Sequence, residues 1–433
     1  MPWGSPQMYH LPSVWSKRRR THLPGAGRIE ILAASRKFRF GDVPAQSPLE
    51  EETPNMTNPL VELQQYGQSP WYDTISRGMI TSGEIARLIE EDGLRGMTSN
   101  PAIFEKAIAG SRDYANTLGQ LAATGRSPIE IYEAIAIQDI QWTADVLSTV
   151  YESTEGRDGY ISLEVSPHLA HDTQGTIDEA LRLAAEVGRP NLMVKVPGTA
   201  AGLPAIEHLI GEGLNVNITL LFSVENYIEV SIAYMAGLER LASRGGNLGE
   251  VASVASFFVS RIDAMVDNLI EKRLGEVKSA AERLALRSLR GRVAIANAKL
   301  AYSHYRELVA SERWQKLAAG GAQTQRLLWA STSTKNPGYR DVLYVEQLIG
   351  ADTVNTMPEA TLIAFRDHGL LAATLEDRVE EAEDIMSGLG ELGISMKDVT
   401  DKLQKDAVRL FVEPFDKLLS TIEAQCEAVP RRA

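Results

Sequence analysis

Eight short strand-like runs alternate with helix-like segments after Met56, and this alternation constrains the fold more than any other feature of the chain. Strands that alternate with helices are typical of a parallel sheet, because each parallel strand needs a crossover connection. Eight such units predict an α/β fold of the (β/α)8 type, a TIM barrel with additional helical insertions. The predicted strands are 70–73, 94–100, 160–165, 192–196, 214–221, 251–257, 325–331 and 352–357.

The helix-like segments have recognisable starts and stops. Glycines 93 and 188 predict two helix ends, and two longer insertions, about 101–155 and 257–320, are expected to form solvated outer helices. Three capping boxes predict helix starts at Thr81-x-x-Glu84, Ser127-Pro-x-Glu130 and Thr176-x-x-Glu179.

Residues 1–55 differ from the rest of the chain. Eight Lys and Arg side chains accompany a single acidic residue, Glu30, in the first forty positions, and no periodicity is sustained. We therefore predict a basic, disordered N-terminal extension at 1–55, followed by a barrel domain at 56–433. A transit peptide and a translation start at Met56 are the other interpretations. The segment lacks the Ser-rich amphipathic stripe of a transit peptide, which favours an appendage or a start at Met56.

Charge and cysteine content limit the possible partners and compartment. The net charge of −13 argues against a nucleic-acid partner, although local arginines can still bind an anionic substrate. No apolar stretch approaches the roughly 20 residues that a membrane helix needs. The single cysteine, Cys426, excludes intramolecular disulfides and predicts a reducing, cytoplasmic location. The oligomeric state is expected to be a monomer or a homodimer.

Lys195 is a lone charged residue within one of the predicted strands. It lies in Asn191-Leu-Met-Val-Lys-Val-Pro-Gly-Thr199, where Pro197-Gly198 end the run, so it is expected near the carboxyl end of a buried strand. In a barrel this end carries the catalytic residues. Burial disfavours a charged ammonium, and a neutral amine can attack a carbonyl, so we interpret Lys195 as a Schiff-base lysine. The alternative is a structural lysine whose head reaches water or pairs with a carboxylate.

Polar residues recur where the other predicted strands end. All eight strand ends of a barrel meet on one face, so these side chains are expected to converge. Taken singly, Asp73 could cap a helix, Asn100 could form a turn, and Thr219 could be a core residue. The whole set is Asp73, Thr98, Ser99, Asn100, Glu164, Asn217, Thr219, Ser256, Ser331, Asn355 and Thr356.

Four motifs follow one another on the expected strands. They are Ser99-Asn-Pro101, Asn191-Leu-Met-Val-Lys-Val-Pro197, Asn215-Val-Asn-Ile-Thr-Leu-Leu-Phe-Ser223 and Ser256-Phe-Phe-Val-Ser-Arg261. In this order they resemble the motifs of transaldolases in their longer bacterial form, a family of class I Schiff-base enzymes. The resemblance extends from about residue 58 to 424. It implies a transferase of the pentose phosphate pathway that moves a dihydroxyacetone unit from sedoheptulose 7-phosphate to glyceraldehyde 3-phosphate. The products are erythrose 4-phosphate and fructose 6-phosphate, and no cofactor is needed.

The resemblance also implies roles for individual residues. Lys195 forms the Schiff base, and Asp73 is the acid/base that deprotonates the C4 hydroxyl of the donor. Glu164 and Thr219 hold the water that is needed to make and break the imine. The residues expected to bind the dihydroxyacetone portion and the phosphate are Asn100, Asn217, Ser256 and Arg261.

Two parts of the sequence bear on what the resemblance implies for the phosphate site and for the type of reaction. After the seventh strand, shorter transaldolases place a second phosphate-binding arginine, whereas this chain offers Ser331 and Lys335, which we expect to complete the phosphate site. Aldolases of the family carry an amide and a tyrosine where this chain has Glu164 and Phe258. Transaldolase is therefore favoured over the alternative, a class I aldolase acting on fructose 6-phosphate or a related sugar phosphate. A non-catalytic barrel that only binds sugar phosphates would not need Lys195, Asp73 and Glu164 together.

A metal site is not predicted. His168-x-x-His171-Asp172 has a spacing that could ligate a metal ion, but no further Cys or His cluster accompanies it. The chain has neither a dinucleotide fingerprint nor a phosphate-loop motif in the required strand–helix context. In a Schiff-base mechanism, the positive charge of the imine takes the electron-accepting role that a metal ion has in other aldol enzymes.

Overall fold

The structure is a computed structural model of the 433-residue chain and describes residues 58–428. The basic segment 1–55 lies outside the described residues, so its interpretation as an extension stays a prediction. Among the described helices, none is both long enough and apolar enough to cross a membrane.

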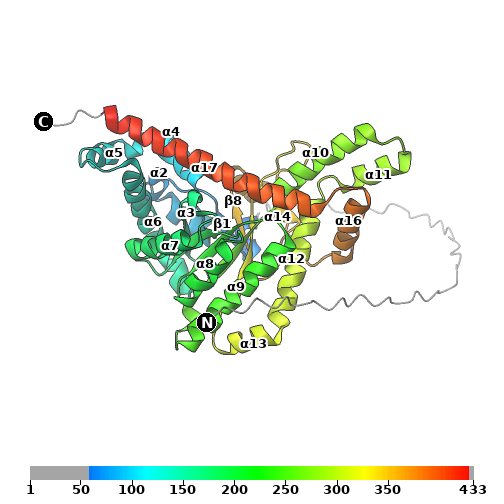
Figure 1. The fold of residues 1–433 in the computed structure, drawn as a ribbon, viewed down its shortest axis with the longest axis horizontal. Helices are drawn as coiled ribbons and strands as arrows, with labels where there is room; N and C mark the ends of the chain where they lie inside the picture. Colours follow the sequence, from blue (N-terminus) through cyan, green and yellow to red (C-terminus); the bar gives the residue numbers. More distant parts are fainter. Residues whose placement is uncertain (1–57, 429–433) are drawn as a thin grey trace, which may run out of the picture. The chain divides into compact units, whose positions relative to one another are not determined.

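Eight parallel strands close into a barrel in chain order, and β8 pairs with β1 (Figure 1). All strand residues are buried, as expected when side chains fill the interior and helices cover the outside. The strands are β1 Gln68–Tyr72, β2 Gly96–Met97, β3 Tyr160–Glu164, β4 Leu192–Pro197, β5 Val216–Leu221, β6 Ser253–Phe258, β7 Arg326–Ala330 and β8 Thr353–Met357. The predicted (β/α)8 barrel is confirmed.

The second strand is shorter than the predicted run 94–100. Only Gly96 and Met97 pair as a strand, because Asn100 already caps the next helix. A Cβ atom on Gly96 would lie 2.5 Å from the Trp71 ring, so this position needs a glycine for Trp71 to fit inside the barrel.

Helices cover the outside of the barrel and fill the two predicted insertions. Residues 101–155 hold α4 to α6 and residues 257–320 hold α10 to α13, which lie outside the strands as predicted (Figure 1). The helices are α1 Pro59–Glu62, α2 Arg77–Thr81, α3 Glu84–Glu91, α4 Pro101–Gly110, α5 Ala115–Ala122, α6 Pro128–Ser153, α7 Thr173–Val187, α8 Gly202–Gly211, α9 Val224–Ser243, α10 Ser260–Glu276, α11 Ala280–Leu289, α12 Val293–Ala310, α13 Glu312–Ala319, α14 Leu343–Glu346, α15 Glu359–His368, α16 Val379–Glu391 and α17 Met396–Ala428.

The helix ends at α6 and α7 agree with the sequence. Glu130 Oε2 accepts a hydrogen bond from Ser127 N at 2.8 Å, which confirms the capping box that begins α6. Gly188 ends α7 in the left-handed conformation, with φ of 58°, and its N–H donates to Ala184 O.

The two other predicted capping boxes are wrong. Thr81 lies in the last turn of α2, and α3 begins only after Gly83, whose left-handed φ of 78° separates the two helices. Thr176 lies inside α7, because Asp172 caps that helix by accepting a hydrogen bond from Gly175 N at 3.0 Å. In both places a stronger local stop or cap lies close to the predicted box.

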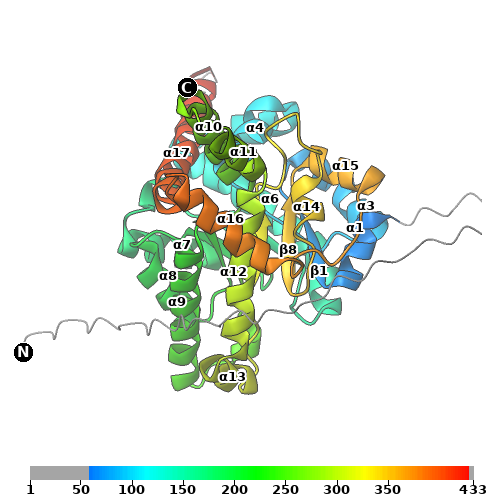
Figure 2. The same ribbon diagram turned by 90° about the vertical axis from the view of Figure 1, so that its right-hand side faces the viewer.

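Helix α17 crosses the carboxyl end of the barrel (Figures 1 and 2). It packs against α4, against α10 and against the end of β5. Its buried residues recur at helical spacing and form one apolar stripe. The apolar ones are Val399, Leu403, Ala407, Phe411, Phe415, Leu418 and Ile422.

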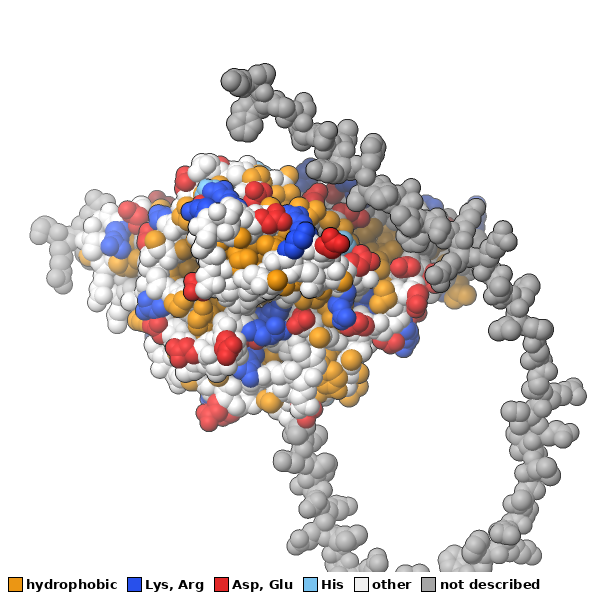
Figure 3. All heavy atoms as spheres, turned by 90° about the horizontal axis from the view of Figure 1, so that it is seen from below, with side chains coloured by type: hydrophobic (Ala, Val, Ile, Leu, Met, Phe, Trp, Pro, Cys, Tyr) orange, Lys and Arg blue, Asp and Glu red, His pale blue; other side chains and the backbone are white. Residues whose placement is uncertain are grey.

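The face of the molecule seen from below carries basic and acidic side chains interspersed with each other (Figure 3). Elsewhere in the described structure, ion pairs such as Arg240–Glu212 at 2.9 Å and Arg313–Glu239 at 2.7 Å also place opposite charges side by side. A nucleic-acid partner would instead need basic side chains gathered on one surface.

Candidate active site

Glu164, Lys195 and Asn217 occupy paired positions on three adjacent strands. In the register of β3, β4 and β5, Lys195 pairs with Glu164 on one side and with Asn217 on the other. Paired residues of neighbouring strands project to the same side of a sheet, and all three side chains are buried. The strands therefore bring an amine, a carboxylate and an amide together near the carboxyl end of the barrel.

Lys195 makes two polar contacts. Its Nζ donates a hydrogen bond to Ser99 O at 3.1 Å and lies 3.1 Å from Glu164 Oε2. The contact with Glu164 is an ion pair without hydrogen-bond geometry, so Oε2 has no directed donor among the described residues. The two side chains are only 6% and 5% exposed. Within the described part of the chain, the amine is therefore buried with only two polar contacts.

The charged form of Glu164 is disfavoured in this setting. Burial raises the pKa of the Glu164 carboxyl, and the nearby Lys195 lowers it by less, while the carboxylate of Asp73 raises it slightly further. The pKa of this carboxyl is therefore higher than that of an exposed glutamate.

Asp73 follows β1 and lies at the edge of the barrel mouth. Its N–H continues the sheet by donating to Met357 O at 2.9 Å, and its Oδ1 accepts from Thr98 Oγ1 at 2.6 Å. Thr98 in turn is 2.7 Å from Thr356 Oγ1. Burial raises the pKa of Asp73 although the residue keeps some exposure, and the attraction of Lys195 only partly offsets the increase. The alternative that Asp73 caps a helix is not what these contacts indicate.

Thr219 lies at an irregularity of β5. The register with β6 shifts between Ile218 and Leu221, and Leu220 has a left-handed φ of 65°. Such a bulge redirects side chains near active sites. The buried Thr219 Oγ1 has no hydrogen-bond partner among the described residues, and the same is true of Glu164 Oε2. Each of these two buried oxygens therefore has hydrogen-bonding capacity left for a polar ligand.

Asn217 and Ser256 form a buried polar chain. Ser256 Oγ donates to Asn217 Oδ1 at 2.6 Å, and Asn217 Nδ2 donates to Ser162 Oγ at 2.9 Å. These bonds fix the orientation of the amide. Asn100, the third predicted binding residue, caps α4 by accepting from Ile103 N at 3.1 Å, so its oxygen already has a structural role.

Three of the predicted anion-binding residues come from the ends of β6 and β7. Arg261 is in the first turn of α10, and its guanidinium lies 5.8 Å from the centre of the Phe258 ring. Ser331, which follows β7, has a left-handed φ of 57°, and its Oγ lies 3.1 Å from Ser260 Oγ. Lys335 lies in the loop after β7 and donates to Ser333 Oγ at 2.6 Å.

The cations in this part of the mouth repel one another. Burial lowers the pKa of Lys335, and the nearby Arg261 lowers it further, while Asp73 raises it. Lys106 on α4 also lowers the pKa of Lys335, so it belongs to the same group of cations. The sequence reasoning missed Lys106, because a lysine on an amphipathic helix gives no signal of its own. Mutual repulsion of this kind is relieved when an anion binds.

Helix α17 contributes to the site although it lies far from Lys195 in the sequence. The centre of the Phe411 ring lies 5.5 Å from Lys195 Nζ. The apolar periodicity of this helix indicates a buried face, but it cannot indicate what that face covers. Phe411 could therefore not be predicted from the sequence, and neither could the Ser99 carbonyl that accepts a hydrogen bond from Lys195.

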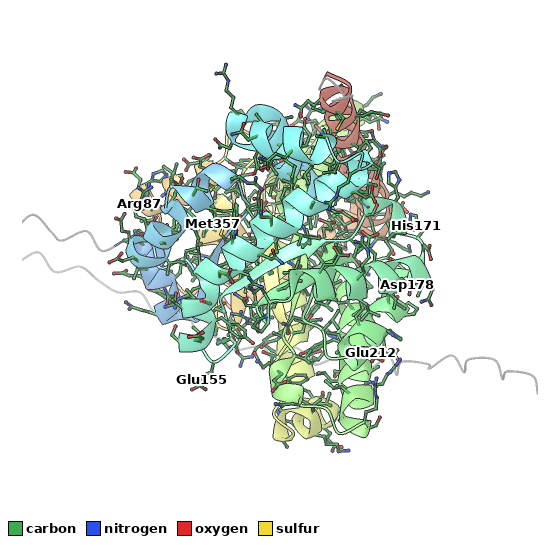
Figure 4. The ribbon with its side chains drawn as sticks, turned by 90° about the vertical axis from the view of Figure 1, so that its left-hand side faces the viewer. Arg87, Glu155, His171, Asp178, Glu212 and Met357 are labelled. Carbon is green, nitrogen blue, oxygen red and sulfur yellow. The ribbon has the colours of Figure 1, made fainter. Side chains whose placement is uncertain are left out.

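The two histidines after β3 do not form a ligand set. His168 Nε2 lies 2.7 Å from Asp416 on α17, whereas His171 is exposed at the edge of the molecule (Figure 4). Within residues 58–428, no group of three or more His, Cys, Asp or Glu side chains is placed to hold a metal ion.

The chain is similar in sequence to known proteins over most of its length. A family model described as transaldolase/fructose-6-phosphate aldolase matches residues 70–422. The chain belongs to this family. It is 47% identical over 370 residues to "Transaldolase" of Trichodesmium erythraeum, covering 85% of this chain and 97% of that protein. It is 48% identical over 371 residues to "Transaldolase 2" of Nostoc sp., with the same coverage, and 46% identical over 371 residues to "Transaldolase" of Parafrankia sp., covering 86% of this chain and 98% of that protein.

Membership confirms the resemblance to transaldolases that the four motifs carried. The family description names two activities, and the three relatives are all named as transaldolases. The alignment with the transaldolase of Trichodesmium erythraeum covers 370 of the 433 residues of this chain. About one seventh of the chain therefore lies outside the alignment.

Proposed function

We propose that this member of the transaldolase family is a transaldolase and carries out its covalent chemistry on Lys195. It transfers a three-carbon dihydroxyacetone unit from sedoheptulose 7-phosphate to glyceraldehyde 3-phosphate, and the products are erythrose 4-phosphate and fructose 6-phosphate. The observation that carries the assignment of Lys195 is its burial at the carboxyl end of β4, 3.1 Å from the raised-pKa carboxyl of Glu164.

The reaction begins when the neutral amine of Lys195 attacks the C2 ketone of the donor. A proton reaches the oxygen of the carbinolamine, water leaves, and a protonated imine remains. Asp73 then accepts the proton of the C4 hydroxyl, the C3–C4 bond breaks, and the aldose leaves with a carbonyl at its former C4. The bonding electrons stay on the three-carbon unit, where the imine nitrogen accepts them to form an enamine. Attack on the acceptor aldehyde reverses these steps.

Glu164 and Thr219 bind the water that is released when the imine forms and consumed when it is hydrolysed. A water between them would satisfy the two buried oxygens that have no protein donor or partner among the described residues. The raised pKa of Glu164 allows its carboxyl to hold the proton that leaves with the carbinolamine oxygen as water, and the carboxylate can take a proton back during hydrolysis.

The remaining residues hold the donor by its two ends. Asn217 and Ser256 bind the dihydroxyacetone portion through polar groups whose positions are fixed by each other. Asn100 contributes through its amide nitrogen, because its oxygen caps α4. Arg261 and Lys335 bind the phosphate; Ser331 and Lys106 lie at the same part of the mouth. The small-molecule partners are sugar phosphates.

Arg261 should act on binding rather than on chemistry. The phosphate is held in both the ground state and the transition state, so Arg261→Ala should raise KM for phosphorylated donors and leave kcat almost unchanged. Steady-state kinetics with fructose 6-phosphate and with unphosphorylated fructose check this. An equal loss with both sugars would remove Arg261 from the phosphate site.

The choice between transferase and aldolase rests on Phe258 and Glu164. Phe258 is buried, with its ring centre 5.1 Å from that of Phe222, and it can neither donate a proton nor hold a water. The enamine must wait for an acceptor aldehyde without being protonated, and an apolar ring beside it prolongs that wait.

Product analysis tests this choice. With fructose 6-phosphate as donor, we expect transfer to erythrose 4-phosphate, which gives sedoheptulose 7-phosphate, to be much faster than release of free dihydroxyacetone. Phe258→Tyr should shift the balance toward release. Release by the wild type as fast as transfer would identify an aldolase.

The proposal includes a cytoplasmic location and a barrel that does not depend on residues 1–55. The single cysteine supports the first, and the folding of the barrel from β1 onward supports the second. A chain that begins at Met56 should match the full chain in activity and in Tm. A loss of several degrees would mean that the segment contributes to the barrel. The monomer or homodimer expected from the sequence stays a prediction.

A further inference from the structure

Helix α17 places one aromatic ring next to the reacting lysine, although it is far from Lys195 in the sequence. The centre of the Phe411 ring lies 5.5 Å from Lys195 Nζ, and Phe411 is 6% exposed. Strand β4 carries the lysine and α17 carries the ring, so the contact exists only when the helix lies across the barrel mouth, as Figures 1 and 2 show.

The position of the ring is fixed by polar contacts on the same helix. Gln404 Nε2 donates to Gly198 O at 3.2 Å and to Asn226 Oδ1 at 3.0 Å, which ties α17 to the residues that follow β4 and β5. Gln404 and Phe411 are seven residues apart and therefore project from the same side of the helix. At the other end, Lys417 pairs with Glu105 on α4 at 2.7 Å.

We propose that Phe411 is a positioning residue that decides how long the enamine on Lys195 survives before it meets an acceptor. The inference rests on the proposed function, in which the three-carbon unit is bound to Lys195 Nζ. The ring covers the nitrogen side of that unit with a surface that offers neither a proton nor a site for water.

The chemistry that Phe411 suppresses is a side reaction of the same intermediate. If water donates a proton to the nucleophilic carbon of the enamine, the unit becomes a protonated imine. Water then adds to C2, the C–N bond breaks, and free dihydroxyacetone leaves with the Lys195 amine restored. Protonation of the enamine carbon is the step that transfer does not share, and exclusion of stray water slows it, while the attack of an aldehyde on the enamine needs no water.

Phe411 differs from Phe258 in its place in the fold. Phe258 belongs to β6 and packs against Phe222 and Arg261, whereas Phe411 reaches Lys195 from a helix that follows all eight strands. The two rings therefore approach the enamine from different elements.

Phe415 provides a matched control. It lies one helical turn further along α17, is 4% exposed, and packs against Tyr132 with ring centres 5.4 Å apart and against His168 at 5.9 Å. Phe411→Leu and Phe415→Leu remove similar buried aromatic surface from the same helix, so they should lower Tm by similar amounts.

The experiment uses the full chain with fructose 6-phosphate as donor and an excess of erythrose 4-phosphate as acceptor, so that the transfer product is sedoheptulose 7-phosphate. We measure free dihydroxyacetone and transfer product together, the Tm of each variant, and the adduct on Lys195 after borohydride reduction. Phe411→Leu should raise the ratio of release to transfer severalfold while Lys195 is still trapped, and Phe415→Leu should leave this ratio at the wild-type value.

Three results would overturn the inference. An unchanged ratio in Phe411→Leu, or an equal change in Phe415→Leu, would mean that the ring only packs the helix. A wild type that forms no adduct on Lys195 would overturn the proposed function itself, and the role of Phe411 with it. If a leucine variant does not fold, Phe411→Met and Phe415→Met replace the ring by a flexible side chain that fills irregular gaps, and they give the same comparison.

Discussion

Among the described residues, two buried ion pairs involve a barrel strand, one at each end of the barrel, and their hydrogen bonding differs. Arg326 begins β7 and pairs with Asp158, which precedes β3, at 2.8 Å. Lys195 and Glu164 lie at the carboxyl end and are 3.1 Å apart. The exposed fractions are almost the same, 5% and 7% for the first pair and 6% and 5% for the second. Burial alone therefore does not distinguish the first pair from the pair that we propose to be catalytic.

Hydrogen bonding does distinguish them. Asp158 accepts from Arg326 Nη2 at 2.8 Å, from Ser69 Oγ at 2.8 Å and from Trp71 Nε1 at 3.2 Å. Glu164 has the ion pair with Lys195 and a raised pKa. A pair whose hydrogen-bonding capacity is filled holds its charges in place, whereas a pair that is left incomplete can pass a proton to a substrate.

The largest expected effect on activity comes from replacing Lys195, the amine of the pair whose hydrogen bonding is incomplete. Lys195→Arg keeps the charge and the ion pair but removes the nucleophile, because a guanidinium is not deprotonated in proteins. We expect no measurable turnover and a fold that is unchanged by circular dichroism. Activity above the background of an empty-vector preparation would show that another group is the nucleophile. Lys195→Ala should be equally inactive.

The second largest effect on activity is expected from replacing Asp73, the carboxylate at the edge of the barrel mouth. Asp73→Ala should slow carbon–carbon cleavage by about 10²–10⁴-fold, the usual cost of removing a positioned acid/base group, and should slow imine formation much less. Single-turnover kinetics with borohydride quenching separate the two steps. Equal slowing of both would mean that Asp73 acts before cleavage.

The third effect contrasts the stability of the two pairs. Asp158→Ala leaves Arg326 buried without its partner and should lower the free energy of unfolding by about 3–5 kcal/mol. Glu164→Gln keeps the side-chain volume and should cost much less stability while lowering kcat. Urea unfolding and kinetics on both variants make the test. If Glu164→Gln were as destabilising as Asp158→Ala, the distinction between the pairs would not hold.

The smallest effect comes from a buried carboxyl that has no cation beside it. Asp263 accepts hydrogen bonds from Ala294 N at 2.8 Å and Tyr344 OH at 3.0 Å, yet burial raises its pKa to about 7. The folded state therefore binds this proton more tightly than the unfolded state, in which the pKa is about 3.9. Stability from this group is fully present below the unfolded value and is lost as the pH rises through about 7.

Asp263→Asn removes this titration. The free energy of unfolding of the wild type, relative to the variant, should fall between about pH 4 and pH 8. Urea unfolding across this range measures it. A constant difference would mean that the Asp263 pKa is not raised in the folded state.

The sequence predicted the catalytic end of the barrel much better than the structural end. A lone charge in an apolar strand and polar residues at strand ends are local signals, so Lys195, Glu164 and Asp73 could be named. The pair of Arg326 and Asp158 joins residues that are 168 positions apart, and neither lies in a distinctive pattern. Only the closure of the barrel brings them together.

The contribution of α17 could not be predicted for a related reason. Its apolar stripe is visible in the sequence, but an amphipathic helix shows which side is buried and not which surface it covers. Phe411 and Gln404 acquire their contacts from the path of the helix across the mouth. The two failed capping boxes differ in origin, because Gly83 and Asp172 are local signals that outweighed the boxes.

The central claim is that the incompletely bonded amine, Lys195, forms the imine, and one measurement tests it directly. The full chain is incubated with fructose 6-phosphate, reduced with borohydride, digested, and analysed by mass spectrometry. We predict a single reduced adduct, located on the peptide that contains Lys195 and absent from Lys195→Arg. An adduct on another lysine, such as Lys335 or Lys299, or no adduct at all, would contradict the account.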